Sequence, residues 1–572
     1  MTTHRLPAAL LFAAFFVLYG LLAAPYFIGG DHVLFTFVGI DGGYAQAPGY
    51  PLFSLLCRLF VAVLPVAPIH ATSLGTALIG ALAVSVFFKG LSAWGIETRS
   101  AVIAAAVFGL MPHVVFMHTQ AEVFALNHLF AGLILWACAP NPSTSVWKTG
   151  GLGLLAGLAL SHHHTIVFLA PLGLWTVYRQ LRVSDRPIVA GLLGVAGLLV
   201  GLTPYLYLVM AAQGSPTPWH WGDPTTASGL LDIFLRRDFG TLSMTVAEGD
   251  TTSTIWQQWA FLAKSVSVEV LGIGLVVAAL GGKEIWQKNR GLAWALGATL
   301  LLSGPIFVAL FHRPPEGLDE LLVQKFHLLF LWGFTILIAF GVDAGFKRQA
   351  RSTYLIAGFW LLIALIFSGT RTHSLQDNAP SLFVQDLWAP LPDNAVLIGT
   401  GDDVTAGSWE YLAENKKAGF TIAADLLAHS WYRDQVNATL GISTKDAGEK
   451  VDLAEVIDAI HASGRPVFMS SILNPELARI YPTYPYGLTI AMLPVGGKAL
   501  LPMAAAAENA RVFDGFAYDG PENHAGPWAT HVATAYASPW AMLANAFKGM
   551  GDSNSEAQAA AMRDRYVPRE KE

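Results

Sequence analysis

Charged residues are scarce in this sequence. Asp, Glu, Lys and Arg make up 13% of its 572 residues, whereas hydrophobic residues make up 54% and the mean hydropathy is +0.48. A soluble globular protein usually carries about a quarter of its residues as charged side chains. Because half that density leaves most of the surface without charge, the chain is predicted to be a polytopic α-helical membrane protein.

The sequence also lacks an excess of positive charge and has few cysteines. Its net charge of −6 argues against nucleic acid as a partner. The two cysteines, Cys57 and Cys138, lie in apolar surroundings, which argues against a disulfide framework. The N-terminal apolar run is long for a signal peptide and further spans follow it, so we expect an uncleaved first helix.

Apolar runs recur through the first two thirds of the chain. A hydrocarbon core of about 30 Å needs about 20 helical residues, and on this basis we predict about 11 transmembrane helices. They lie at 6–28, 71–90, 100–116, 121–138, 149–162, 164–178, 188–211, 258–281, 291–311, 322–342 and 353–369. The segment 51–66 is apolar but short and contains Arg58, which favours a helix lying at the membrane interface.

Lysine and arginine occupy alternate connections between these spans. They are Lys89 and Arg99; Lys148; Arg179, Arg182 and Arg186; Lys283, Lys288 and Arg290; and Lys347, Arg348 and Arg351. Short basic loops stay in the cytoplasm. The pattern therefore predicts a cytoplasmic N-terminus and an extracytoplasmic location for everything after residue 370.

Two domains are predicted from the change in composition near residue 370. Residues 1–370 form a transmembrane domain whose first outer loop is 29–70, and residues 371–572 form an extracytoplasmic α/β domain with a helical C-terminal part. Short strands are expected in "NAVLIGTGDD", "AGFTIAADLL", "GRPVFMSSIL" and "YGLTIAMLP", with helices between some of them. The acidic pair in "TGDDV" follows a predicted strand, where a turn explains it better than a metal site.

The outward-facing loops carry the unusual polar residues. Asp31 and Glu122 lie at the membrane edges of their segments, where an ionised carboxylate is costly unless it is paired or takes part in chemistry. Each of them could instead cap a helix or pair with an arginine. Lys264 and Glu269 lie inside a predicted span, so each needs a polar partner or a cavity.

Three consecutive histidines, His162 to His164, raise the possibility of a metal site. Successive residues of a helix point in different directions and cannot all bind one ion. Structural metal sites also favour spaced ligands, often thiolates. We therefore expect these histidines to form hydrogen bonds to a substrate or to neighbouring residues, and we expect no bound metal.

Several motifs in register resemble a family of bacterial and animal membrane proteins related to the protein O-mannosyltransferases. These motifs are "GGD", "QAPGYPLF", "AEVFALNHLFAGLILW", "GLALSHHHT", "WHWGDPTTASGLLDIFLRRDFG" and "LPDNAVLIGTGDDVTAGSWEYL". The sequence departs from the family at Gln46–Ala47, where His-Pro is usual, and at Gln324–Lys325, where Glu-Arg is usual. The resemblance covers most of the chain from about residue 25 to 435 and implies the GT-C fold of glycosyltransferases.

The resemblance implies a donor sugar, mannose in the family, attached to a polyprenyl phosphate, and an acceptor Ser or Thr hydroxyl on an extracytoplasmic protein. Our hypothesis is that Asp31 is the general base, with Glu122 in reserve, and that the displacement inverts the anomeric carbon. The location would be the inner membrane of a bacterium. Neither a cofactor nor a divalent metal is expected.

Candidate donor- and substrate-binding residues lie on the same outward loops. They are Gln46, Pro48, Gly49, Tyr50, His162, His163, His164, Trp219, Trp221, Asp223, Arg236, Arg237 and Lys325. The three cations would offset the charge that grows on the leaving phosphate. The two tryptophans could stack on a sugar, although tryptophan is common at membrane interfaces without any ligand.

Three other functions fit the same sequence. The donor chemistry could serve a glycan or lipid acceptor in place of a protein. A transporter or flippase would show inverted repeats and charge at mid-depth, whereas here no repeat is visible and only Lys264 and Glu269 lie inside a span. A scaffold without activity would not need Asp31 and Glu122.

Overall fold

The computed structural model describes residues 4–140, 144–214, 219–241, 253–444, 452–471 and 473–567. The chain divides into two compact units. Unit 1 comprises Met1–Pro25 and Gly42–His373, and unit 2 comprises Tyr26–Asp41 and Ser374–Glu572. The predicted first outer loop is therefore divided, because its first part, up to Asp41, belongs to unit 2 and the rest to unit 1.

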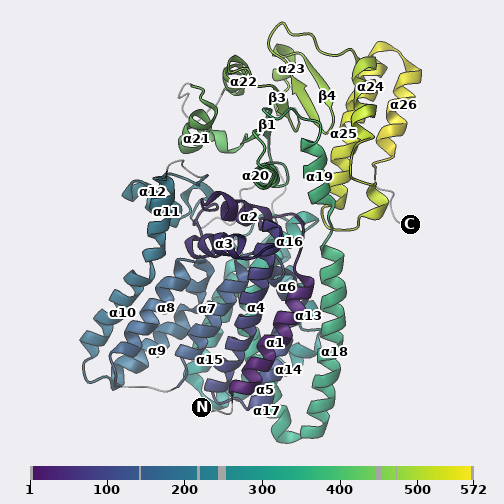
Figure 1. Ribbon diagram of the computed structural model, residues 1–572. Helices are drawn as coiled ribbons and strands as arrows, with labels where there is room; N and C mark the ends of the chain where they lie inside the picture. Colours follow the sequence, from purple (N-terminus) through teal and green to yellow (C-terminus); the bar gives the residue numbers. More distant parts are fainter. Residues whose placement is uncertain are drawn as a thin grey trace. The chain divides into compact units, whose positions relative to one another are not determined.

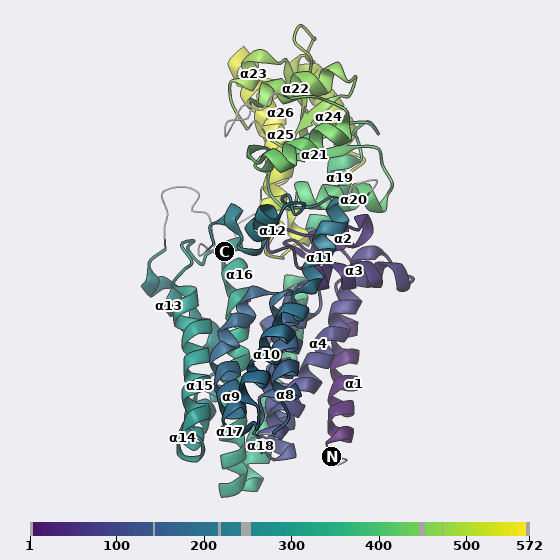
Figure 2. The same ribbon diagram turned by 90° about the vertical axis from the view of Figure 1, so that its left-hand side faces the viewer.

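Unit 1 is a bundle of helices that run side by side, as both views show (Figures 1 and 2). Its longer helices are α1 (Arg5–Leu22), α4 (Pro68–Ala93), α5 (Thr98–Gly109), α7 (Phe124–Ala137), α8 (Trp147–Leu160), α9 (Ala170–Val183), α10 (Pro187–Gly201), α13 (Ile255–Glu269), α14 (Ile273–Lys288), α15 (Arg290–Leu301), α17 (Leu328–Arg348) and α18 (Ala350–Leu375). Shorter helices are α3 (Pro51–Val63), α6 (Pro112–His118), α11 (Leu206–Ala212), α12 (Ala227–Phe234) and α16 (Leu318–Gln324).

The predicted number of spans is not confirmed. Among the described residues, five helices are long and apolar enough to cross a membrane, or seven if each of two bent pairs counts as one span. The difference has a physical cause: several predicted spans are short α-helices continued by irregular turns. For example, α15 has 12 residues and leads into a π-helical turn at Leu302–Ile306 that contains Pro305.

Two predicted spans are sharply bent. The predicted helix 100–116 is broken into α5 and α6, which meet at 70°, and the predicted helix 258–281 is broken into α13 and α14, which meet at 98°. Pro112 begins α6. At the second break, Leu271 and Gly272 both have positive φ, which ends α13. Broken backbone within a membrane bundle is tolerated where it is buried in protein or lines a cavity.

The helix α3 runs across the direction of the bundle helices (Figure 1). Its buried face includes Phe53, Ser54 and Cys57, whereas Leu59 and Val63 on another face are exposed. A helix is therefore confirmed within the predicted segment 51–66, and its location at a membrane interface stays a prediction.

The N-terminus lies at the same end of the bundle as the turns after α9 and after α17 (Figure 1). Those two turns hold basic residues of the predicted cytoplasmic set, including Arg186 and Arg348. These two of the five basic connections therefore lie at the same end of the bundle as the N-terminus. Which side of a membrane that end faces stays a prediction.

Unit 2 contains a mixed sheet of five strands in the described part of the chain, in the order β2-β1-β3-β5-β4. Its strands are β1 (Val396–Gly399), β2 (Phe420–Ala423), β3 (Val467–Met469), β4 (Thr483–Tyr486) and β5 (Thr489–Met492). β1 pairs in parallel with β2 and β3, whereas β5 is antiparallel to β3 and β4. Four of the strands fall in the four predicted segments, and β4 was not predicted.

Helices surround this sheet. They are α19 (Ala379–Trp388), α20 (Thr405–Glu414), α21 (Ser430–Leu440), α22 (Leu453–Ala462), α23 (Leu477–Ile480), α24 (Pro502–Phe513), α25 (Ala529–Met550) and α26 (Ser553–Asp564). Within unit 2, α24, α25 and α26 lie together beside the sheet (Figure 1). The acidic pair after β1 forms a turn, in which Gly401 has positive φ and its carbonyl accepts a bond from the Thr405 hydroxyl.

The segment that carries Asp31 packs within unit 2. Asp31 immediately precedes the helix α2 (His32–Asp41), which lies against α20. The Phe37 and Trp409 rings pack with their centroids 5.8 Å apart. The first part of the predicted loop of the transmembrane domain is therefore largely a helix that packs against α20 of unit 2.

Candidate functional site

A buried ion pair lies at the centre of the candidate site in unit 1. The Lys325 ammonium Nζ lies 3.4 Å from Oε1 of Glu122, and the two side chains are only 11% and 5% exposed. Glu122 stands just before α7, and Lys325 begins the 3₁₀ turn Lys325–His327 between α16 and α17. Two charges far apart in the sequence are thus held together out of contact with bulk water.

A second buried acidic side chain, that of Glu269, lies beside Gln324, the residue before this turn. It accepts hydrogen bonds from the His113 backbone N–H at 3.1 Å and from the amide nitrogen of Gln324 at 3.4 Å. Gln324 ends α16 and directly precedes Lys325, so the two acidic side chains contact adjacent residues of the chain. The two helix breaks explain the geometry: one places His113 at the start of α6, and the other places Glu269 at the end of α13.

Hydropathy reasoning flagged Glu269 as a charge that needs a partner but did not include it among the site residues. Its companion in that reasoning, Lys264, behaves differently. Lys264 is 66% exposed and pairs with Glu320 at 3.2 Å. The signal that separates the two is position: Glu269 ends its helix at a break, whereas Lys264 lies on the outer surface of the same helix.

The three histidines reach three different partners. His162 contacts the Val123 carbonyl through Nε2 at 2.8 Å, His163 contacts the Thr165 hydroxyl through Nδ1 at 2.6 Å, and His164 contacts the Tyr205 hydroxyl through Nε2 at 3.3 Å. Within the described ranges, no group of three or more His, Cys, Asp or Glu residues is placed to hold a metal ion.

His163 joins the ion pair to the first-loop motif. Its ring packs against Tyr50 with centroids 5.7 Å apart and against Phe124 with centroids 5.5 Å apart. Phe124 in turn packs on Phe326, next to Lys325. Four separate stretches of the chain thus meet around Glu122 and Lys325, and they form a shell that is aromatic and weakly polar.

The motif that contains Tyr50 is a compact turn. The Gly49 N–H donates to the Gln46 carbonyl at 2.8 Å, Pro48 lies between them, and Pro51 begins α3. Gly49 and Tyr50 both have positive φ. A side chain at position 49 would meet a Leu208 methyl group at 2.6 Å, so the close packing here requires glycine.

The fourth loop places its two tryptophans differently. The Trp221 indole is buried, stacks on Phe239 and donates from Nε1 to Asp238 at 2.8 Å. Trp219 is half-buried and packs edge-on against Trp221. Trp221 therefore has a structural role, and Trp219 is the better placed of the two to meet a ligand.

The charged residues of this loop also separate. Asp223 is exposed and caps a turn by accepting from the Thr225 N–H at 3.0 Å. Arg237 is exposed and pairs with Asp232. Arg236 is half-buried, has positive φ, and lies close enough to His163 and His164 for its charge to act on both imidazoles. Of the two predicted arginines, Arg236 is therefore the one whose charge reaches the histidines.

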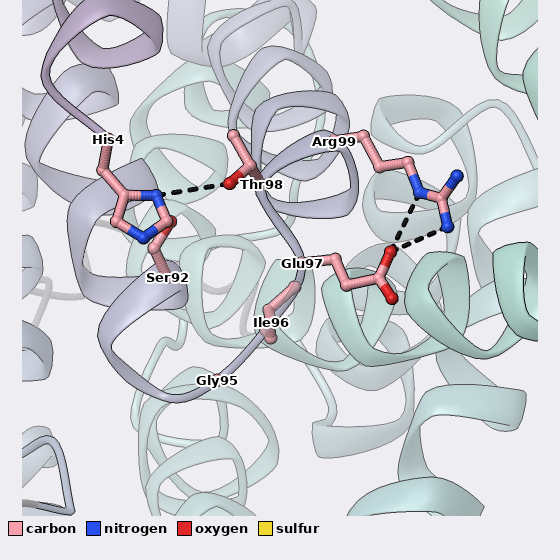
Figure 3. Close-up of a pocket in the computed structure, with 7 residues that line it drawn as sticks. All are labelled: His4, Ser92, Gly95, Ile96, Glu97, Thr98 and Arg99. Atoms are coloured by element: carbon pink, nitrogen blue, oxygen red, sulfur yellow. Dashed lines mark hydrogen bonds and ion pairs between the residues drawn. The ribbon is translucent and has the colours of Figure 1, made fainter. Parts of the chain in front are cut away.

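A separate pocket of about 590 Å³ lies at the turn between α4 and α5. Figure 3 shows the residues that line it: His4, Ser92 and Gly95–Arg99. His4 contacts the Thr98 hydroxyl at 3.3 Å and Arg99 pairs with Glu97. No predicted site residue lines this pocket, and its charged groups are already paired with each other. We therefore place the candidate site around Lys325.

Residues 40–186 match the family model of the protein O-mannosyl-transferase TMEM260 N-terminal domain. This range includes the Tyr50 turn, Glu122 and the three histidines. Asp31 and Lys325 lie outside it.

Two curated proteins match over most of the chain. It is 30% identical over 445 residues to protein O-mannosyl-transferase TMEM260 of Mus musculus, in an alignment that covers 71% of this chain and 60% of that protein. It is 22% identical over 477 residues to protein O-mannosyl-transferase tmem260 of Dictyostelium discoideum, covering 74% of this chain and 58% of that protein. The chain is related to the TMEM260 proteins.

This relationship confirms the family resemblance predicted from the motifs. The chain spans about 60% of the length of the two TMEM260 relatives. Among solved structures, the crystal structure of ArnT from Cupriavidus metallidurans in the apo state is similar, with a TM-score of 0.53 at 13% identity, covering 85% of this chain and 97% of that one. At this identity the likeness concerns the fold alone, and it supports the predicted GT-C-like membrane fold.

Proposed function

We propose that this protein is a membrane glycosyltransferase that moves a hexose, mannose by analogy with its relatives, from a polyprenyl-phosphate donor to a Ser or Thr hydroxyl of an extracytoplasmic protein. The relatives that carry the name protein O-mannosyl-transferase support the reaction class. We place the protein in the cytoplasmic membrane of a bacterium, with the N-terminus in the cytoplasm and unit 2 outside.

The observation that carries the proposal is the buried ammonium of Lys325, held against Glu122. Burying a charged lysine costs free energy because the ammonium loses its hydration, unless a partner or a ligand offsets that loss. Glu122 and the surrounding rings hold Lys325 where an anionic group that enters the shell can meet it. A phosphate that becomes a leaving group needs this kind of fixed positive charge as its own charge grows.

The chemistry is a single displacement. The acceptor oxygen forms a bond to the anomeric carbon, the bond from that carbon to the lipid phosphate oxygen breaks, and the phosphate leaves with the electron pair. The acceptor proton passes to a carboxylate, which we assign to Asp31, because a hydroxyl is a poor nucleophile until its proton is being removed. One displacement inverts the configuration at the anomeric carbon.

The other residues take supporting roles in this proposal. Glu122 is already engaged with Lys325, so we assign it to positioning that ammonium and keep Asp31 as the base. Arg236 shares the task of offsetting the phosphate charge. His163 supports the Tyr50 turn, and Trp219 offers a ring face to the sugar. With two fixed cations at hand, we propose that the transfer needs no divalent metal.

The test is transfer of radiolabelled mannose from polyprenyl-phosphate mannose to a serine-containing peptide by the purified protein. We expect Lys325→Met to abolish transfer and Lys325→Arg to retain part of the wild-type activity. We expect Asp31→Asn to abolish transfer while the protein stays folded. The matched control is Lys264→Met, which removes an exposed lysine of the same unit and should leave the rate unchanged. Full activity of Lys325→Met would refute the site.

The acceptor is tested separately. The same donor is offered with a peptide, a glycan or a lipid head group as acceptor. Transfer to the peptide supports the proposal. Transfer only to the glycan or lipid would keep the donor chemistry and replace the acceptor class.

A further inference from the structure

Gly29 and Trp528 are packed so closely that only glycine fits at position 29. A Cβ added to Gly29 would lie 2.0 Å from the indole Nε1 of Trp528 and 2.4 Å from two of the ring carbons. Atoms joined only by packing do not approach so closely, so either the backbone or the ring would have to move. The φ angle of Gly29 is +102°, which also favours glycine. The indole therefore rests directly on the backbone, two residues before Asp31.

The loop before Trp528 is firmly anchored within unit 2. Both oxygens of the Asp377 carboxylate accept bonds there, from the backbone N–H groups of Ala525 and Gly526 at 2.7 and 2.8 Å and from His524 Nδ1 at 2.7 Å. Trp528 itself stands at the N-terminus of α25. The ring that touches Gly29 is thus held by one carboxylate and by a 22-residue helix.

Asp31 is fixed on its other side as well. Its carbonyl accepts from the Phe35 N–H at 3.2 Å, so α2 starts directly from Asp31. The helix is held on α20, where Phe37 packs on Trp409. Phe27 packs against Gly407 of α20: a Cβ added to that glycine would lie 3.4 Å from the Phe27 ring. The Asp31 carboxylate therefore belongs to a short turn that packs on Trp528 before it and continues into α2, which packs on α20, after it.

We infer that Trp528 is a positioning residue: by packing on Gly29 it sets the Gly29–Asp31 turn and so aims the Asp31 carboxylate. This inference rests on the proposed role of Asp31 as general base. A base displaced by about 1 Å from its productive position can lose about 10²-fold in rate. Trp528 of unit 2 thereby acts on the proposed reaction indirectly, through the position of Asp31 in the segment Tyr26–Asp41.

The structure supplies matched variants for the test. Gly29 and Gly30 both have positive φ, at +102° and +73°, so an alanine strains the backbone at either position. A Cβ at Gly30 has nothing within 4 Å, whereas a Cβ at Gly29 meets Trp528. The difference between Gly29→Ala and Gly30→Ala therefore isolates the contact with the indole.

We expect Trp528→Ala to lower kcat about 10²-fold, with little change in KM for the donor. Trp528→Phe, which keeps a ring against Gly29, should retain most of the activity. Gly29→Ala should be slower than Gly30→Ala in the wild-type background, and the two should become equal when Trp528 is also replaced by alanine. Phe547→Leu, at a buried position of the same helix α25, controls for lost stability: it should lower Tm without lowering kcat of the folded protein.

The outcomes separate this inference from the proposed function. If Asp31→Asn is inactive while Trp528→Ala keeps its kcat, Asp31 is the base and the positioning role is overturned. If Gly29→Ala and Gly30→Ala differ by the same factor with and without the indole, the positioning role is also overturned. Wild-type turnover by Asp31→Asn would overturn both.

Discussion

Lys325 and Glu122 form an ion pair that is almost closed to solvent, with 3.4 Å between Nζ and Oε1. Removing two charges from water costs several kcal/mol for each ion, and their attraction repays this only when both remain. Such a pair is therefore weak evidence for added stability. It is stronger evidence for a function that needs a charge at that place.

Breaking the pair from one side should destabilise the protein. We expect Glu122→Gln or Lys325→Met to lower the free energy of unfolding by about 3–5 kcal/mol, because each leaves one buried charge without its counter-ion. The double variant should recover much of this loss, yet remain inactive because the ammonium is gone. Thermal unfolding in detergent, together with the transfer assay, checks both halves.

The exposed pair of Lys264 and Glu320 is the control for this experiment. Its partners are 66% and 35% exposed, so breaking it should change stability by about 0–1 kcal/mol. Equal losses at the two pairs would show that Lys325 and Glu122 are not buried as described.

Close contact between α8 and α10 gives a second prediction. A Cβ on Gly153 would lie 2.0 Å from the Gly194 carbonyl oxygen, and a Cβ on Gly157 would lie 2.2 Å from that of Leu198. Small residues let transmembrane helices approach this closely. Gly153→Val and Gly157→Val should therefore lower Tm and the yield of folded protein, because the opposing atoms are backbone and cannot swing aside.

The same helices contain suitable control positions. Gly151 on α8 and Gly191 on α10 have nothing within 4 Å of an added Cβ. Valine at either position should leave Tm close to that of the wild type. A similar loss at all four positions would mean that side-chain size in this region, not the contact between α8 and α10, decides stability.

Some elements of the fold could be predicted from the sequence and others could not. The order of the motifs indicated the relationship to known proteins, and the four strand segments were found because buried strands are short, apolar and bounded by turn residues. Hydropathy could not find the breaks after Glu269 and before Pro112, since an apolar run keeps the same mean whether the helix is straight or bent. For the same reason, the predicted number of transmembrane helices, about 11, exceeds the five to seven found among the described residues.

The candidate site was predictable in part. Glu122, Lys325, Tyr50 and His163 were singled out from the sequence, and the structure brings these four together. The contact of Glu269 with His113 was not predicted, because it depends on two helix ends that meet in space. The packing of Gly29 on Trp528, 499 positions later in the numbering, left only the glycine itself as a local signal.

Removal of metal gives a third prediction. If Lys325 and Arg236 supply the positive charge that the leaving phosphate needs, a divalent ion has no remaining task. Transfer should therefore continue at the wild-type rate after dialysis against EDTA, and added Mg²⁺ or Mn²⁺ should not raise it. Loss of activity in EDTA that one of these ions restores would contradict the proposal and call for a metal-assisted mechanism.

The contact between His531 and Asp403 predicts a pH dependence of stability. The hydrogen bond from His531 Nε2 to Asp403, at 2.8 Å, raises the pKa of the imidazole above its usual value. A raised folded-state pKa means that folding favours the protonated form. The contribution to stability is then fully present below the unfolded-state pKa, about 6.5, and is lost as the pH rises through the higher folded-state pKa.

His461 on α22 provides a comparison of opposite sign, because burial lowers the pKa of its imidazole. We expect the difference in Tm between wild type and His531→Ala to be largest near pH 5 and to shrink towards pH 9, whereas the difference for His461→Ala should grow over the same range. Differential scanning fluorimetry of the whole protein measures both. A flat profile for His531→Ala would mean that Asp403 does not bind the charged imidazole in the folded protein.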